Sequence, residues 1–161
     1  HTVYQHVCIL PLLFLFFVTV AAYTVIYTLS LHDALPIYTL DQMVAHVKNL
    51  LEKLELPYRV AKLCGGDLGF TSALTFDMEV FSAAQEKWLE VSSISNFETF
   101  QANRLKLRYK SEGNKPQLAH TLNGSALALP RILASILENN QTETGINVPK
   151  VLVPYTGFDT I

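Results

Sequence analysis

The stretch HTLNGSALALPRILASILENNQ, residues 120–141, changes its hydrophobic period half-way along. Its first part alternates, with small or apolar residues on one face of a strand and the polar Asn123 and Ser125 on the other. From Leu129 onward the apolar residues recur with a helical period, and Arg131 lies off the apolar stripe. The sequence therefore predicts a strand that leads directly into a helix, with a guanidinium beside the polar strand face.

Pro130 supports this boundary because the first turn of a helix needs no backbone N–H at that position. We expect Ser135 and Glu138 to lie off the apolar stripe together with Arg131. The predicted stripe comprises Leu129, Ile132, Leu133, Ile136 and Leu137.

The composition of the 161-residue chain argues against two classes of site. The net charge of −2 gives no global basic field of the kind that nucleic-acid binding proteins often show. The two cysteines, Cys8 and Cys64, have no metal-ligand spacing and cannot form a disulfide framework. This cysteine usage fits a reducing compartment, and we expect the cytoplasm.

The first 37 residues differ sharply from the rest, because Asp33 is their only charged residue. Val7–Leu29 has no charge and is long enough to cross a hydrocarbon layer of about 30 Å as a helix, although no basic residue flanks it. Alternatively, YTLSLHDALPI, residues 27–37, resembles translated sequencing-adapter DNA, so that this part is an artefact. Under either interpretation we divide the chain into residues 1–37 and 38–161.

After this junction the patterns predict an α+β fold, in which helices flank an antiparallel sheet. One amphipathic helix is expected over Thr39–Leu56, and Asn96–Ala102 is expected to be a loop. The glycine-rich CGGDLG, residues 64–69, lacks the spacing of a phosphate-binding loop and is expected to be a turn. The expected strands are Tyr58–Leu63, Phe76–Phe81, Trp88–Ser95, Arg104–Tyr109, Gln117–Ala128 and Val148–Val153.

Two strands have polar faces with alternative interpretations. In Trp88–Ser95, Glu90 either points to solvent or faces a nucleotide and its metal, because a buried carboxylate needs a partner. In Arg104–Tyr109, the alternating cations form either a solvated face or a contact for tRNA phosphates.

Residues 120–141 resemble motif 3 of class II aminoacyl-tRNA synthetases, in which a small-residue strand precedes a helix with an ATP-binding arginine. Two segments are similar in sequence to the seryl-tRNA synthetases: LNGSALALPRILASILENNQ, residues 122–141, and EVSSISNFETFQANRL, residues 90–105. The chain departs from the generic motif at Ala126 and Ala128, where glycines are usual, and at Pro130, where an acidic residue is frequent.

The resemblance implies an ATP site at Glu90 and Ser93, with Val91 and Ser92 between them. Glu90 would also hold Mg²⁺, whose preference is for hard oxygen ligands. Because Glu90 and Ser93 have opposite strand parity, both can reach one site only if the strand bulges or ends near Ser92.

Further roles follow from the same resemblance. Arg131 would stabilise the triphosphate of ATP, since its guanidinium is always charged. Ser125 would contact the serine substrate, and Asn123, on the same strand face, would order that pocket.

The resemblance covers residues 38–161 and only the C-terminal part of the family's catalytic domain. It implies a partial class II synthetase fold, preceded by an unrelated hydrophobic helix. The full-length family joins serine to ATP, transfers it to tRNA(Ser) and forms homodimers. No tRNA-binding coiled-coil arm, motif 1 or motif 2 is found here, so we expect the chain alone to be inactive. The alternatives are a membrane-tethered, non-catalytic binding module, which requires a genuine Val7–Leu29, and a domain whose motif positions are scaffold only.

Overall fold

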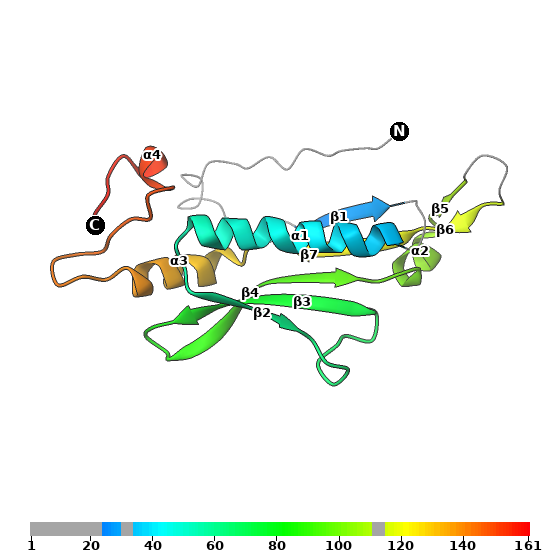
Figure 1. Cartoon of the computed structure of the whole chain (residues 1–161), viewed down its shortest axis with the longest axis horizontal. Coiled ribbons are helices and arrows are strands. Elements are labelled where there is room, and N and C mark those ends of the chain that lie inside the picture. Colours follow the sequence, from blue (N-terminus) through cyan, green and yellow to red (C-terminus); the bar gives the residue numbers. More distant parts are fainter. Residues whose placement is uncertain (1–23, 30–33, 111–114) are drawn as a thin grey trace.

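The computed structural model describes residues 24–29, 34–110 and 115–161, and its central element is a five-stranded antiparallel sheet (Figure 1). The strand order is β1-β7-β4-β3-β2, so the strand predicted to precede the motif 3 helix lies inside the sheet. Together with the helices, this sheet confirms the predicted α+β class. The strands are β1 (Thr24–Leu29), β2 (Tyr58–Lys62), β3 (Leu74–Ser82), β4 (Lys87–Asn96) and β7 (His120–Ser125).

Helix α1 (Ala34–Lys53) packs along the sheet, on β3, β4 and β7. It begins before the expected Thr39 and crosses the expected boundary at residue 38, and the division of the chain there stays a prediction. The apolar residues of its helical repeat are buried, as their spacing predicts. They are Leu40, Met43, Val47 and Leu51, with Leu54 directly after the helix.

Helix α3 (Leu129–Asn139) follows β7 after a short extended connection, and Pro130 lies in its first turn as predicted. Ile132 and Ile136 join the core. Ser135 is fully buried, against expectation, because α3 packs on both β3 and β4 and its covered face is wider than the apolar stripe.

The two faces of the sheet differ in chemistry because neighbouring residues of a strand point to opposite sides. The core face includes Met78, Val80, Ile94 and Leu122, all buried. The opposite face is polar. It includes Asp77, Glu79, Ser93 and Asn123, none of which belongs to the core. Each of these four is next to a core-face residue in its own strand or pairs with such a polar neighbour. The polar face is therefore the side of the sheet on which a site can form.

The strand expected over Arg104–Tyr109 is confirmed only at residues 108–109, and the loop expected over Asn96–Ala102 only at residues 97–99. Helix α2 (Phe100–Leu105) overlaps both predicted segments, and β5 (Arg108–Tyr109) pairs with β6 (Gln117–Leu118) in a separate ribbon. Helix α2 buries the small Ala102, whereas Leu105 is 68% exposed. The alternation of apolar and basic residues from Arg104 to Tyr109 therefore did not indicate which residues are buried.

The expected strand Gln117–Ala128 is interrupted at Ala119, which separates β6 from β7, and β7 ends at Ser125. The strand expected over Val148–Val153 is also wrong. That segment ends in the short helix α4 (Val153–Thr156), which Pro154 is suited to begin. The expected turn at residues 64–69 is confirmed by hydrogen bonds from the Asp67 and Leu68 amides to the Cys64 carbonyl.

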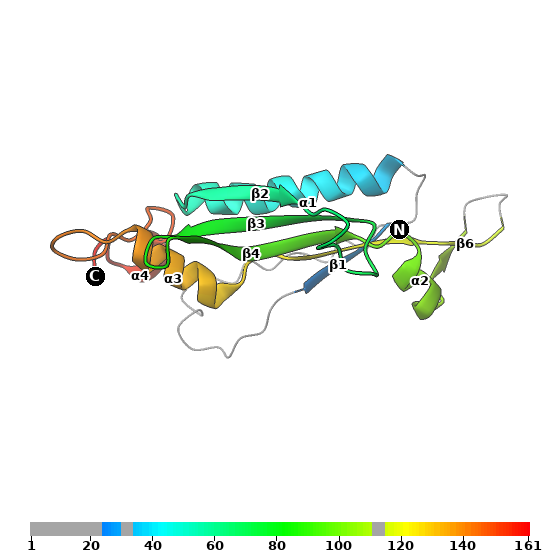
Figure 2. The same cartoon turned by 90° about the horizontal axis from the view of Figure 1, so that it is seen from below.

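Most of the expected hydrophobic helix Val7–Leu29 lies outside the described residues. Its last six residues form β1, which pairs with β7, so the helix prediction is wrong over that part. Within residues 24–29, 34–110 and 115–161, no helix is both long and apolar enough to span a bilayer. In both views α2 and the β5–β6 ribbon lie at one end of the sheet and α3 and α4 at the other (Figures 1 and 2).

Candidate functional site

Strand β4 contains the irregularity that the proposed ATP site requires. Met78 pairs with Ser92, but the next residue, Glu79, pairs with Glu90, so that Val91 is an extra residue in β4. Such a bulge shifts the alternation of side chains by one. Glu90 and Ser93 therefore share the polar face, and the expectation of a bulge near Ser92 is confirmed.

The segment 90–93 is tied to the segment 125–131 at every residue. Regular pairing of β4 with β7 covers only residues 94–96 of β4. Before residue 94 of β4, individual hydrogen bonds join the two segments. These bonds run from Arg131 Nη1 to the Glu90 carbonyl (2.6 Å), from the Ala128 amide to the Val91 carbonyl (2.6 Å), from Ser92 Oγ to the Ser125 carbonyl (2.6 Å) and from the Ser93 amide to Ser125 Oγ (3.3 Å).

These bonds decide which predicted groups are free for a ligand. Val91 and Ser92 are buried, and the Ser92 hydroxyl already donates to a carbonyl, so their side chains are structural. Glu90 and Arg131 are exposed. Ser125 Oγ accepts a bond from the Ser93 amide, which leaves its own O–H free to donate.

Asn123 lies on the same face of β7 as Ser125, two residues earlier, and its pairing partner on β4 is Ser95. Ser95 is already bonded to Thr75 through the two hydroxyl oxygens, 2.7 Å apart. The polar row thus continues from Ser125 across the sheet, and Asn123 remains a candidate for ordering a substrate pocket.

Two carboxylates that sequence reasoning did not assign, Asp77 and Glu79, lie beside the site. They pair with Ser93 and Glu90, so all four side chains share one face. Partial desolvation of its carboxyl group and the charge of Asp77 raise the pKa of Glu90, Glu79 adds to this, and Arg131 opposes it. The sequence does contain a signal for them, because Asp77 and Glu79 alternate with apolar residues in a predicted strand and so must share one face.

The two added carboxylates differ in their partners. Glu79 forms an ion pair with Arg59, whose guanidinium also lies 4.7 Å from the centroid of the Trp88 ring. Asp77, in contrast, has one oxygen, Oδ1, that is buried and has no hydrogen-bond partner. A buried unpartnered carboxylate oxygen is costly, which indicates that a donor or cation is expected at this position.

The residues present fit Mg²⁺ carried by a polyphosphate better than a metal centre made by protein alone. Glu90, Asp77 and Ser93 offer hard oxygen atoms, the ligand type that Mg²⁺ prefers. Among the described residues, however, no three His, Cys, Asp or Glu side chains are grouped so that they could hold a metal by themselves. Mg²⁺ usually takes one or two carboxylates and completes its shell with phosphate oxygens and water.

Residues 32–140 match the family model described as "tRNA synthetase class II core domain (G, H, P, S and T)", which covers more than half of the chain. The chain belongs to this family. Both segments that form the polar site lie within the matched part of this core domain.

The proteins to which this chain is similar are serine–tRNA ligases. A serine–tRNA ligase of Salinibacter ruber is 56% identical over 124 residues, which is 76% of this chain but 29% of the relative. A seryl-tRNA synthetase of Pyrococcus horikoshii, solved with ATP, superposes with a TM-score of 0.79 at 36% identity, over 86% of this chain and 31% of that one. A cytoplasmic serine–tRNA ligase of Naegleria fowleri, solved with AMP, gives 0.78 at 32% identity, over 86% and 33%. This chain therefore spans less than a third of the curated relative.

Proposed function

We propose that residues 38–161 form part of the ATP- and serine-binding site of a serine–tRNA ligase. The observation that supports this most directly is the set of bonds that hold residues 90–93 against residues 125–131. It brings a carboxylate, a guanidinium and two serine hydroxyls from distant parts of the sequence to one polar face. The relatives named above act as serine–tRNA ligases by name, and two related structures hold ATP or AMP.

The first half-reaction explains why these groups are needed together. The serine carboxylate attacks the α-phosphate of ATP, the bond to the β-phosphate breaks, and seryl-adenylate and pyrophosphate form. Negative charge accumulates on the phosphates, and fixed positive charge nearby lowers the barrier. Arg131 supplies such charge: one of its N–H groups is bonded to the Glu90 carbonyl, and its other donors remain for phosphate oxygens.

The remaining roles follow from exposure and bonding. Ser93 contacts ATP, with Val91 and Ser92 contributing backbone and position only, because their side chains are buried. The free O–H of Ser125 donates to the serine substrate, and Asn123 orders that pocket. When Mg²⁺ is bound with ATP, it offsets phosphate charge, and Glu90 is the residue that holds it.

The remaining substrate of the whole protein is tRNA(Ser), to which the seryl group is transferred, and its working form is a homodimer in the cytoplasm. The free, exposed thiol of Cys64 is consistent with a reducing compartment. The membrane-tethered alternative depends on residues 7–29, and no contact of the described residues favours it.

A chimera tests the proposal. Residues 38–161 replace the homologous part of the Salinibacter ruber ligase, and serine-dependent ATP–pyrophosphate exchange and tRNA(Ser) charging are measured. We expect the chimera to be active and its Glu90→Gln and Arg131→Ala variants to lose exchange. Unchanged exchange in both variants would leave these positions as scaffold only. The 161-residue chain alone is assayed in parallel, and detectable exchange there would contradict its predicted inactivity.

A further inference from the structure

Helix α3 is held against the hairpin of β3 and β4 at both of its ends. At its start, Arg131 Nη1 donates to the Glu90 carbonyl of β4. At its other end, Glu138 and Asn139 reach the hairpin where β3 turns into β4. The helix and this turn lie together at the end of the sheet opposite α2 (Figures 1 and 2). We call the bonds of Glu138 and Asn139 to residues 81–84 the hairpin clamp.

Glu138 satisfies two donors of the hairpin turn. Its Oε2 accepts from Ser82 Oγ (2.5 Å) and from the Ala84 amide (3.4 Å). Ser82 is fully buried, and its hydroxyl oxygen accepts in turn from the Gln85 amide (3.2 Å). A short bond from a hydroxyl to a carboxylate is roughly twice as strong as one between neutral groups. The turn is therefore built around a carboxylate that a distant helix supplies.

Asn139 adds a second attachment to the same hairpin. Its Nδ2 donates to the Phe81 carbonyl of β3 and to the Ser135 carbonyl of its own helix, both at 2.8 Å. Asn140, the next residue, has the same side chain, but its Nδ2 donates to the Ile136 carbonyl within α3. The two asparagines thus offer a matched comparison between a bond to the hairpin and a bond inside the helix.

The two attachments of α3 have matching spacings on the helix and on the hairpin. Arg131 and Glu138 are two turns apart, so they lie on one side of α3, about 10 Å from each other along its axis. On the hairpin, Glu90 is three residues beyond Lys87, which pairs with Ser82, and three residues of a strand also span about 10 Å. Because the two spacings agree, the clamp at one end of the helix determines where Arg131 meets β4 at the other.

The start of α3 needs such a reference because few polar contacts fix it. Among the described residues, no side chain caps its N-terminus, and Pro130 lacks a backbone donor there. Contact with β4 is made by the Ala128 amide, which donates to the Val91 carbonyl, and by Arg131 itself. Arg131 is exposed, so its position depends on the helix that carries it.

We propose that Glu138 and Asn139 are positioning residues of the ATP site: the hairpin clamp sets the placement of α3 along β4 and thereby places the Arg131 guanidinium. This inference rests on the proposed function, in which Arg131 contacts the triphosphate. Ser125 lies in β7, before the helix, and is bonded to the Ser93 amide. Loss of the clamp should therefore affect the use of ATP and not the binding of serine.

Pyrophosphate exchange by the Salinibacter ruber chimera tests this role. Glu138→Ala and Asn139→Ala each remove hydrogen bonds of the clamp and should lower kcat/KM for ATP about fivefold. The KM for serine should stay within about twofold of the parent value, as should all constants of the control Asn140→Ala. Glu138→Gln should restore kcat/KM to within about twofold, because an amide oxygen accepts the same two bonds.

A double substitution separates positioning from a general loss of stability. In the Arg131→Ala background, Glu138→Ala should lower kcat/KM for ATP by less than about twofold more, since no guanidinium is left to place. The loss of thermal stability caused by Glu138→Ala should persist in that background. Thermal unfolding also verifies that each variant is folded at the assay temperature.

Amide hydrogen exchange of the 161-residue chain, measured by NMR, tests the clamp without the reaction. The Ala128 amide is at the far end of α3 from the clamp, and the Phe97 amide, bonded to the Thr121 carbonyl, is the reference for general destabilisation. Glu138→Ala should raise the exchange rate of the Ala128 amide relative to that of the Phe97 amide about fivefold.

Each of four results would overturn the proposal. They are an unchanged kcat/KM for ATP in Glu138→Ala, an equal loss in Asn140→Ala, losses from Glu138→Ala and Arg131→Ala that multiply in the double variant, and an unchanged ratio of the two amide exchange rates. Full activity of the Arg131→Ala variant alone would instead contradict the proposed function. The ratio of exchange rates would then still decide whether the clamp places the helix.

Discussion

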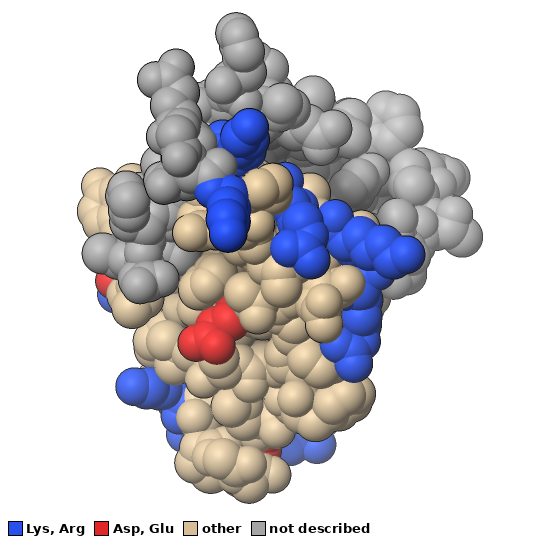
Figure 3. All heavy atoms as spheres, turned by 90° about the vertical axis from the view of Figure 1, so that its right-hand side faces the viewer, with Lys and Arg blue, Asp and Glu red and all other residues tan. Residues whose placement is uncertain are grey.

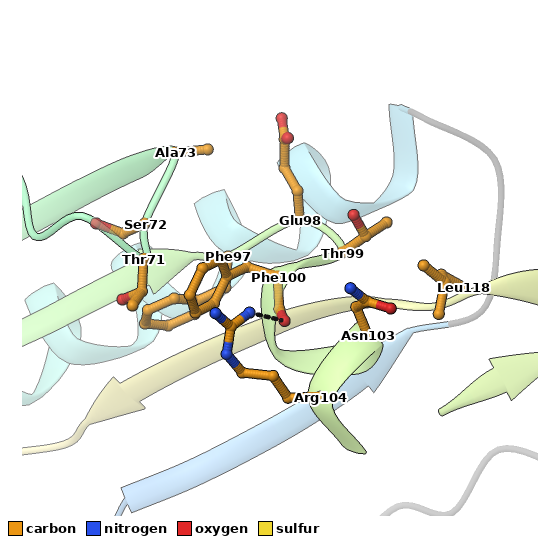
Figure 4. A pocket seen from close by; sticks show the side chains of 10 residues that line it. All are labelled: Thr71, Ser72, Ala73, Phe97, Glu98, Thr99, Phe100, Asn103, Arg104 and Leu118. Carbon is orange, nitrogen blue, oxygen red and sulfur yellow. Dashed lines mark hydrogen bonds between the residues drawn. The ribbon is translucent and has the colours of Figure 1, made fainter. Parts of the chain in front are cut away.

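The polar site lies on one face of the sheet, and a group of exposed cations, which we call the basic end, lies at the α2 end (Figure 3); the two regions are held in different ways. The cations of the basic end are Arg104, Lys106, Arg108, Lys110 and Lys115. At the polar site, Arg131 and Glu90 are joined by a bond between residues 41 positions apart. At the basic end, Arg104 bonds to Phe100, four residues earlier on the same helix (Figure 4), and Tyr109 bonds to Gln117 across a short ribbon. The first arrangement exists only in the complete fold, whereas the second is largely local.

This difference has a thermodynamic consequence. Loss of a long-range bond at the polar site separates strand β4 from the start of α3 and should be felt by the whole domain. Loss of a local contact at the basic end should change that end alone, because few core residues depend on it. Five substitutions test this difference, in order of decreasing expected effect.

Arg131→Ala in the chimera should have the largest effect, on activity. Hydrogen bonds to charged groups contribute about 1.5–3 kcal/mol each, so loss of the guanidinium should lower kcat/KM for ATP about 10- to 100-fold in pyrophosphate exchange. Arg131→Lys keeps the charge but not the planar fork and should recover only part of this. Lys150→Ala is the control, and a loss equal to that of Arg131→Ala would contradict a specific role.

Gly124→Val should have the largest effect on stability. A Cβ at Gly124 would lie 3.1 Å from both Ile94 Cγ1 and Met43 Cε, so the larger side chain overpacks the contact between β7, β4 and α1. We expect a loss of about 1–3 kcal/mol in the free energy of unfolding, measured by urea denaturation. Gly65→Val is the control, since no atom lies within 4 Å of a Cβ there.

Ser92→Ala removes the buried hydroxyl that donates to the Ser125 carbonyl. Because that carbonyl then loses its partner, we expect a stability loss of about 1–3 kcal/mol, at the lower end if water reaches it. Exchange activity of the chimera should also fall, since Ser125 is positioned by this bond. A fall in stability without any change in the KM for serine would show that this bond does not position Ser125 for substrate.

Arg104→Ala should change stability less than any substitution at the polar site. It removes a cation–π contact on the surface, worth about 0.5–1 kcal/mol, and a hydrogen bond within α2. The same urea measurement applies. A loss as large as that of Gly124→Val would show that the basic end is coupled to the core, and the contrast between the two regions would fail.

The smallest effect is the pH dependence that Glu90 adds. Its pKa is raised above 4.5 in the folded chain, so the folded state keeps the proton longer than the unfolded state. Stability should therefore fall as pH rises from 4.5 through the raised pKa, and Glu90→Gln should abolish that part of the profile. Mg²⁺-dependent ATP binding should rise over the same interval. Thermal unfolding at a series of pH values, as the difference between parent and variant, measures the first effect.

Much of the scaffold could be predicted because its signals are local. The repeat of Leu40, Met43 and Val47 predicted α1, and the change of period at Leu129 predicted the boundary between β7 and α3. The FQANRL helix could not be read in this way, because its buried residue is the small Ala102 and its large apolar residue, Leu105, remains exposed. The same limit applies to Val148–Val153, where β-branched residues suggested a strand but a proline-initiated turn of helix follows.

From the sequence alone one could predict the change from strand to helix within residues 120–141, because hydrophobic period is a property of neighbours along the chain. The groups that we propose for ATP and serine came from the resemblance of two short segments to a family. Only the tertiary structure decided that Val91 bulges, that Glu90 and Ser93 therefore share a face, and that Asp77 joins them. It also decided that the Ser92 hydroxyl is buried and donates to the Ser125 carbonyl. These features depend on the register between strands, and register is set by packing and hydrogen bonds between residues far apart in the chain.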